Sequence, residues 1–246
     1  MATTEGELGT DGTDEKAVQE SVGEDSIAKA EVATEPVDGV SAETDVADAQ
    51  LKHHLHQTWC LWVHQGRSKQ QGGDWTETQR MVHEFGTVED FWCMSHFTFT
   101  PSKLENVDYS LFKNGVKPAW EDPAFKNGGR WVIKLEKVKA QSLDDLWLSL
   151  SLALIGEAFM EVGGDLVCGA IVSVRNRASK IALWLSAAKD ERKINAIGRE
   201  YRKVLSGTPG LQDLEAKELT FEDFKKQAVT FVLNKPHSEA SAGVFQ

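Results

Sequence analysis

The sequence has few cysteines, no long apolar run and no basic start. Cys60, Cys93 and Cys168 are an odd number at distant positions, and no two have CxxC spacing. This pattern excludes a zinc knuckle and a disulfide framework, and it is typical of reduced thiols in a cytoplasmic or nuclear protein. No stretch approaches the ~18 apolar residues of a membrane-spanning helix. The first residues lack the basic and apolar regions of a secretory signal.

Motifs of several enzyme classes are also missing. There is no GxxxxGK phosphate loop and no GxSxG nucleophile turn. The one histidine-rich spot is HHLH, with His53, His54 and His56, and no carboxylate follows it at metal-ligand spacing. We therefore expect a protein that is not an enzyme, with no catalytic residue, no metal and no cofactor.

Negative charge is concentrated in the first fifty residues. The chain of 246 residues has a net charge of -11, and residues 1–50 hold 14 of its 38 acidic residues but only Lys16 and Lys29 of its 27 basic ones. This stretch has no aromatic residue, so it cannot bury enough apolar surface to offset the entropy of ordering. We expect a disordered acidic tail at 1–50 and one folded domain at 51–246. The folded domain is nearly neutral, so a nucleic-acid ligand is not excluded.

The apolar pattern of the folded part predicts an α+β domain. Helices are expected from Thr87, from Ser142 to about 159, and at 190–205, with Asp145 completing the cap of the second. Three helices are too few to flank every strand pair, so we expect an antiparallel or mixed sheet with helices on one face. Strands are expected at 58–63, 78–85, 109–112, 130–135, 167–174, 180–185, 219–224 and 228–233.

Two of the eight tryptophans lie in polar loops. Trp75 and Trp120 are each flanked by carboxylates, and such an indole either packs back onto the domain or stacks on a ligand. Two of them favour a site for a flat, cationic ring with N–H donors, such as guanine methylated at N7. Four others lie in apolar runs and are expected in the core, namely Trp59, Trp62, Trp131 and Trp184.

A basic turn supplies a candidate anion site. Arg175, Arg177 and Lys180 lie within six residues in VRNRASK, between two predicted strands. A solvated surface turn would have the same composition, so the turn alone leaves both interpretations open. Beside an aromatic pair, it indicates phosphates attached to the stacked base. A methyl-lysine reader would also use an aromatic cage but would not need this turn.

Several long segments then resemble one family, the cap-binding translation initiation factor 4E family, from about residue 53 to 205. The resemblance implies a strongly curved antiparallel sheet, with the cap on its concave face and three long helices on its convex face. The segments are TVEDFW (87–92), YSLFKNGVKPAWED (109–122), GGRWVI (128–133), LIGEAF (154–159), VCGAIVSVR (167–175) and KIALW (180–184).

The resemblance implies a role for each residue that matches a base-binding position. Trp75 and Trp120 would sandwich the 7-methylguanine, and Glu121 would accept the N1 and N2 protons of the base. Trp184 would lie against the N7 methyl group, which replaces its expected place in the core.

The resemblance also implies which residues meet the phosphates. Arg175 and Lys180 would contact them directly, Arg130 would support them through water, and Arg177 is a weaker candidate.

On the convex face, the resemblance implies a second binding surface. A Tyr-x-x-x-x-Leu-hydrophobic helix of an initiation factor 4G-type scaffold or a 4E-binding protein would dock there. Independently, the apolar residues of the helix from 142 form two stripes, and only one of them can face the sheet. A helix buried on both faces would have the same pattern. The matching positions are Val88, Trp92, Leu148, Leu152, Ile155 and Gly156.

The expected function is binding of the 7-methylguanosine cap of messenger RNA, with recruitment of the 4G scaffold to start translation. The alternative is a cap-binding repressor of the same fold. Tryptophan at 75 favours the initiation-type subclass, because a repressor-type subclass has a different aromatic there. His54 replaces the usual proline of the family and Ser149 a frequent acidic residue, which leaves the partner open. A monomer is the default expectation.

Overall fold

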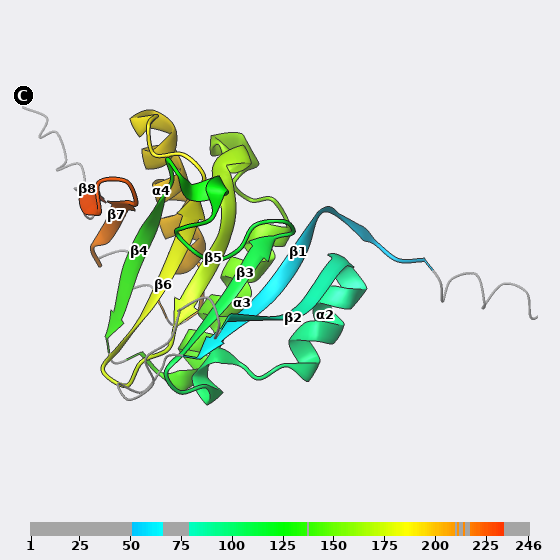
Figure 1. Cartoon of the computed structure of the whole chain (residues 1–246). Coiled ribbons are helices and arrows are strands. Elements are labelled where there is room, and N and C mark those ends of the chain that lie inside the picture. The colour runs from blue at the N-terminus through cyan, green and yellow to red at the C-terminus, as the bar shows by residue number, and fades with distance from the viewer. Residues whose placement is uncertain are drawn as a thin grey trace, which may run out of the picture. The chain divides into compact units, whose positions relative to one another are not determined.

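The computed structural model describes residues 51–65, 79–136, 138–209, 211, 214 and 217–233. These residues form one curved antiparallel sheet with three α-helices (Figure 1). The predicted acidic tail at 1–50 lies outside the described residues, as does Trp75. None of the helices in these ranges is both long and apolar enough to cross a membrane.

Eight strands form the sheet of the described part. Their spatial order is β2-β1-β3-β5-β6-β4-β7-β8, and all neighbours are antiparallel. Every predicted strand is present, and the choice between a mixed and an antiparallel sheet is settled. The strands are β1 (His54–Gln65), β2 (Gln79–Thr87), β3 (Val107–Lys113), β4 (Gly129–Glu136), β5 (Val167–Ser173), β6 (Ala178–Leu185), β7 (Leu219–Asp223) and β8 (Ala228–Leu233).

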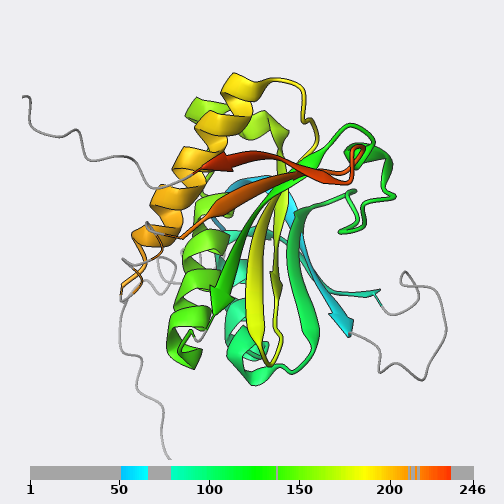
Figure 2. The same cartoon turned by 90° about the vertical axis from the view of Figure 1, so that its left-hand side faces the viewer.

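Three helices cover one face of this sheet. They are α2 (Val88–Phe97), α3 (Ala140–Ile155) and α4 (Glu191–Ser206). Figure 2 shows the helices on one side and the long loop between β3 and β4 on the other, close to the turn between β7 and β8. The sheet therefore has one face for the helices and one face left for a ligand, as the resemblance implied.

Two helix starts agree with the sequence. The Thr87 hydroxyl accepts a hydrogen bond from the Asp90 backbone N–H at 3.2 Å and begins α2. The Asp190 carboxylate accepts from the backbone N–H groups of Arg192 and Lys193 and begins α4. Both caps satisfy backbone donors that the first helical turn leaves free.

The predicted cap of the middle helix was wrong. Helix α3 begins at Ala140, before Ser142, and the N-cap position has no side-chain hydrogen bond. Asp145 instead accepts a bond from the side chain of Gln141 in the first turn. The helix also ends at Ile155 rather than near 159, because Glu157 has a φ of 56°, in the left-handed region.

Alternation along the strands divides the side chains between two clusters. On β4, Trp131 and Ile133 belong to the main core under the helices, whereas Val132 belongs to a smaller cluster on the opposite face. Successive strand side chains point to opposite faces. Arg130 and Lys134 therefore lie on the same face as Val132, away from the helices.

Of the four tryptophans that lie in apolar runs, three are buried. Trp59, Trp131 and Trp184 are each at most 3% exposed. Trp62 is half-buried, because it packs against the smaller cluster on the open face of β1. All three cysteines are free, as predicted.

Candidate functional site

The open face of the sheet carries an aromatic cluster around Trp184. The Trp184 ring centre lies 4.6 Å from that of Phe224 and 4.9 Å from that of Phe125. Phe112 closes a third side at 5.7 Å. Trp184 thus lies on the face that the resemblance assigns to the cap, but Phe224 and Phe125 cover much of its ring.

Trp120 is an exposed aromatic residue on this face, with 55% of its surface open. It lies in the loop between β3 and β4, next to Glu121, which is also exposed. Asp122 holds this loop, accepting hydrogen bonds from the backbone N–H groups of Lys117 at 3.1 Å and Ala124 at 2.9 Å. Of the two sequence-based alternatives for Trp120, packing back onto the domain does not occur.

Beside Trp120 is a hollow of about 370 Å³ that also reaches the β7–β8 turn. Arg130 forms part of its wall, and its Nε and Nη2 atoms donate to Glu222 at 2.8 and 2.7 Å. The guanidinium lies over the Trp184 ring, 5.7 Å from its centre, and 5.9 Å from that of Phe224. The hollow therefore joins an aromatic ring, a fixed cation and carboxylates in one place.

The three cations of the basic turn differ in their partners. Arg175 donates to Asp108 at 2.8 Å and to the carbonyl oxygens of Val107 and Val174 at 3.1 and 2.8 Å. Its charge is matched by a carboxylate, so it braces the turn against β3. Arg177 and Lys180 are exposed, and no ion pair to either is present in the described ranges.

The aromatic end and the basic end are held on the same strands. Trp184 is opposite Arg130 in the β4–β6 ladder, and Lys180 is opposite Lys134. Four residues of strand separate the two ends, roughly 13 Å at ~3.3 Å per residue. This spacing suits a ligand with a base at one end and a phosphate chain at the other. Trp75, the second predicted stacking residue, lies outside the described residues.

Lys134, Phe224 and Glu222 also lie on this face and were not predicted from the sequence. Alternation in the predicted strand at 130–135 already placed Lys134 on the face of Arg130. The contacts of Phe224 and Glu222 depend on β7 pairing with β4, far along the chain, and no local pattern indicates that pairing.

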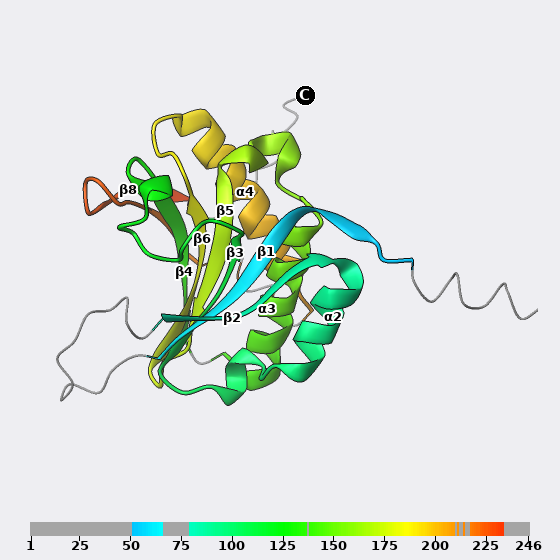
Figure 3. The same ribbon diagram turned by 45° about the vertical axis from the view of Figure 1, so that its right-hand side comes forward.

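On the helical face, the predicted partner residues belong to α2 and to α3 with its C-cap, and Figure 3 shows these two helices next to each other. Trp92 is 48% exposed and Leu152 is 37% exposed. One of the two apolar stripes of α3 is buried, and it consists of Leu143, Leu146, Trp147, Leu150 and Leu154. Of the remaining partner positions, Gly156 is exposed, Val88 and Leu148 are half-buried, and Ile155 is buried.

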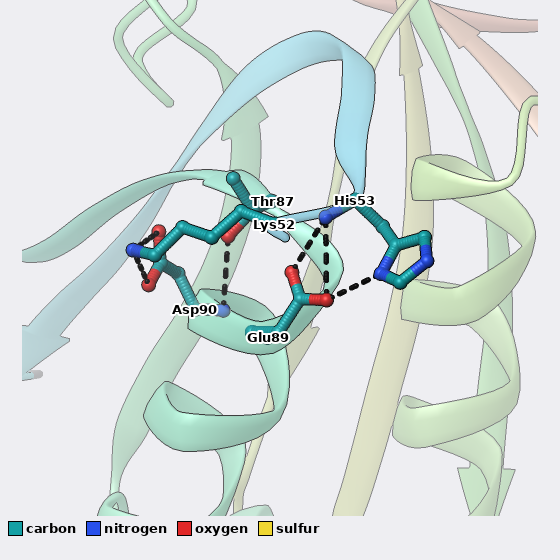
Figure 4. Close-up of polar contacts among 5 residues, drawn as sticks. All are labelled: Lys52, His53, Thr87, Glu89 and Asp90. Carbon is teal, nitrogen blue, oxygen red and sulfur yellow. Dashed lines mark hydrogen bonds and ion pairs between the residues drawn. The ribbon is translucent and has the colours of Figure 1, made fainter. Parts of the chain in front are cut away.

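A set of polar contacts ties the two residues before β1 to the first turn of α2 (Figure 4). Lys52 pairs with Asp90 at 2.9 Å. The His53 Nδ1 atom lies 2.6 Å from Glu89, which also accepts from the backbone N–H of His53. The hydrogen bond from the His53 side chain lowers the pKa of Glu89 from 4.5 to about 2. This clamp holds the edge of the partner surface in place.

Two of the three histidines of HHLH pair with separate carboxylates. His53 pairs with Glu89, whereas His56 pairs with Glu157 at 2.8 Å. Within the described ranges, no group of three or more histidine, cysteine, aspartate or glutamate residues is placed to hold a metal.

Comparison with known proteins finds relatives in sequence and in fold. A relative from Prunus domestica, eukaryotic translation initiation factor isoform 4E, is 38% identical over 173 residues, 70% of this chain and 79% of its own. Ascaris suum eIF4E-3, solved with an m2,2,7G cap, has a TM-score of 0.66 at 33% identity, covering 74% of this chain and 99% of its own. Caenorhabditis elegans eIF4E-3, solved with the 4E-binding protein Mextli and a cap analogue, has a TM-score of 0.65 at 33% identity, with 74% and 100% covered.

The match extends over most of the described domain. The family model for eukaryotic initiation factor 4E covers residues 54–235, which include the sheet, the three helices, Trp120 and the basic turn. The chain belongs to the eukaryotic initiation factor 4E family.

Proposed function

We propose that this protein binds the 7-methylguanosine cap of messenger RNA on the open face of its sheet and acts without catalysis. The observation that carries the proposal is Trp120, a large ring that is 55% exposed on a braced loop beside Arg130 and the hollow. A stacked cationic base would cover this ring, with Glu121 accepting its N–H donors. Two relatives of similar fold are solved with cap ligands, which supports the assignment.

The helical face is proposed to bind a partner helix. Trp92 and Leu152 are apolar side chains exposed on α2 and α3, beside the His53–Glu89 clamp. An amphipathic helix with a Tyr-x-x-x-x-Leu-hydrophobic motif fits such a surface. The C. elegans relative solved with Mextli and the schistosome eIF4E solved with 4E-BP support this class of partner.

The proposed output is translation initiation through a 4G-type scaffold in the cytoplasm, by a monomeric protein. Tryptophan at position 75 supports this output over that of a cap-binding repressor. The scaffold that co-purifies with the full chain distinguishes the two. Recovery of 4G supports initiation, and recovery of a 4E-binding repressor without 4G contradicts it.

The experiment titrates intrinsic tryptophan fluorescence of the full chain with 7-methyl-GTP and with GTP at fixed salt. We expect 7-methyl-GTP to quench the fluorescence at a much lower concentration than GTP. The reason is that methylation at N7 gives the guanine ring the positive charge that strengthens its stacking on Trp120. Equal responses to the two ligands contradict the proposal. Trp120→Ala should lose the methylated ligand and retain the partner, and Trp92→Ala should do the reverse.

A further inference from the structure

Two lysines face each other across the open side of the sheet. Lys134 on β4 is directly opposite Lys180 on β6 in the antiparallel ladder. Directly opposite residues lie on the same face, with Cβ atoms about 4.5–5.5 Å apart. Like charges at that spacing destabilise a sheet. The pair is therefore a cost to the fold unless something negative binds to it.

Within the part of the chain that the structure describes, no carboxylate pairs with these lysines. Both lysines are exposed, and neither ammonium forms an ion pair with any described residue. Glu136 lies two residues further along β4 on the same face, opposite Ala178, and within the described part it also makes no ion pair. The pairing of β4 with β7 runs only from Gly129 to Ile133 and does not reach Lys134. Among the described residues, Lys134 therefore has a cross-strand neighbour on one side, and this neighbour is Lys180.

The neighbouring arginines differ from this pair. Arg130 is matched by Glu222, and Arg175 is matched by Asp108. Those cations are held in place by the fold and contribute little net positive charge. Of the cations on β4, β6 and the turn that joins β5 to β6, Lys134, Lys180 and Arg177 have no carboxylate partner among the described residues.

We propose that Lys134 and Lys180 form a shared phosphate site, in which Lys134 binds the phosphate chain of the capped ligand together with Lys180. The proposal rests on the proposed cap-binding function and adds Lys134 to its binding residues. The pair lies four residues along the strands from Arg130 and Trp184, so a base at the aromatic end would direct its phosphates toward it. Two ammonium groups provide six N–H donors and a double charge, which suits a polyphosphate rather than a single carboxylate.

The test compares 7-methyl-GMP with 7-methyl-GTP on the full chain, by fluorescence titration at several salt concentrations. Lys134→Ala should weaken binding of the triphosphate roughly fivefold or more and reduce the slope of log affinity against log salt by about one. Binding of the monophosphate should change less than about twofold, because its single phosphate lies near the base. Lys193→Ala, an exposed lysine on α4 on the other face, is the matched control and should change neither.

A charge reversal at position 134 adds a second measurement, because it should change the melting temperature and the triphosphate affinity in opposite directions. Lys134→Glu places an acid opposite Lys180, so the melting temperature should rise while triphosphate affinity falls further. A structural role for Lys134 would instead lower the melting temperature of both variants.

The results separate this proposal from the proposed function. Equal loss of both methylated ligands in Lys134→Ala, or no loss of either, overturns the role of Lys134 as a phosphate residue. If the unmodified chain binds 7-methyl-GTP and GTP equally, the cap-binding function fails. Calorimetry with inorganic tripolyphosphate then decides the lysine site alone: weaker binding by Lys134→Ala than by Lys193→Ala supports it, and equal binding rejects it.

Discussion

The guanidinium of Arg130 lies over the ring of Trp184, the residue directly opposite it in the ladder of β4 and β6. Glu222 is opposite Arg130 on its other side, on β7, and accepts from both Nε and Nη2. Trp184, Arg130 and Glu222 thus form a row across β6, β4 and β7. The two outer residues fix the orientation of the guanidinium between them. Arg130 is therefore a prearranged wall of the hollow rather than a freely moving surface arginine.

Arg130→Lys should weaken binding of 7-methyl-GTP while leaving the fold intact. Lysine keeps the charge but cannot donate from two nitrogens of a planar group to Glu222 while stacking on an aromatic ring. The loss should be roughly two- to fivefold, because an exposed ion pair contributes up to ~1 kcal/mol. Fluorescence titration measures the affinity and a thermal melt checks the fold. An affinity equal to that of the unmodified chain would show that the orientation of Arg130 does not contribute.

Trp120→Ala should remove one stacking surface and weaken 7-methyl-GTP binding by ~1–3 kcal/mol. Its melting temperature should stay close to that of the unmodified chain, because the ring is 55% exposed. Retention on a 7-methyl-GTP resin and calorimetry provide the measurements. A variant that unfolds, or one that binds normally, is incompatible with a stacking role for this ring.

Glu121→Ala should weaken binding of 7-methyl-GTP, while the base can still stack on Trp120. The side chain is exposed, so its removal leaves no buried group unsatisfied in the free protein. Residual fluorescence quenching at high ligand concentration is expected, together with a reduced affinity. Glu121→Gln is a matched variant that keeps the shape and removes the charge. Unchanged affinity in both variants would exclude Glu121 as the acceptor of the base protons.

The Glu89 carboxylate should remain ionised to unusually low pH. Its pKa in the folded protein is about 2, below its ordinary 4.5, because the His53 side chain donates to it. A lowered pKa stabilises the folded state at pH values above 4.5, and this stabilisation is lost as the pH falls through about 2. The stability difference between the unmodified chain and Glu89→Gln should therefore shrink between pH 4.5 and 2. Urea melts across this range measure it, and a constant difference would contradict the role of this hydrogen bond.

Gly169→Ala should destabilise the domain by roughly 1–3 kcal/mol, as overpacking of a core does. A Cβ at this position of β5 would lie 2.6 Å from the Phe112 ring and would also meet the Leu111 carbonyl oxygen. Gly86→Ala is the control, because its Cβ would meet only Thr58 at an ordinary 3.4 Å. Chemical denaturation of both variants gives the comparison. Equal stability of the two would show that the β3–β5 contact has room to relax.

Local patterns were sufficient to predict the strands and two of the three helix starts. Short apolar runs bounded by turn residues identify strands wherever one or both faces are buried, and all eight were found in this way. Thr87 and Asp190 are short polar side chains before apolar stripes, and both are caps. Ser142 has the same signature, but α3 had already begun at Ala140, so propensity gave the wrong start there.

The site was predictable only in part, because its contacts join distant segments. The exposure of Trp120 followed from its polar neighbours, and that of Trp92 from its matched position on the partner surface. The cover that Phe224 places over Trp184 comes from a turn forty residues further along the chain. Register is set by the packing of a whole sheet, so a single strand does not specify which residue is opposite it.

The alternation along β4 also limits how this strand can vary in length. Arg130 and Lys134 lie on the open face, while Trp131 and Ile133 fill the core. The two sets of side chains are offset by one position along the strand. Insertion or deletion of one residue in the middle of the strand would turn the cations beyond it inward and the core side chains outward. Substitutions on either face can accumulate separately, whereas the number of residues in β4 must stay the same. Length variation in relatives should therefore fall in the loops on either side of this strand.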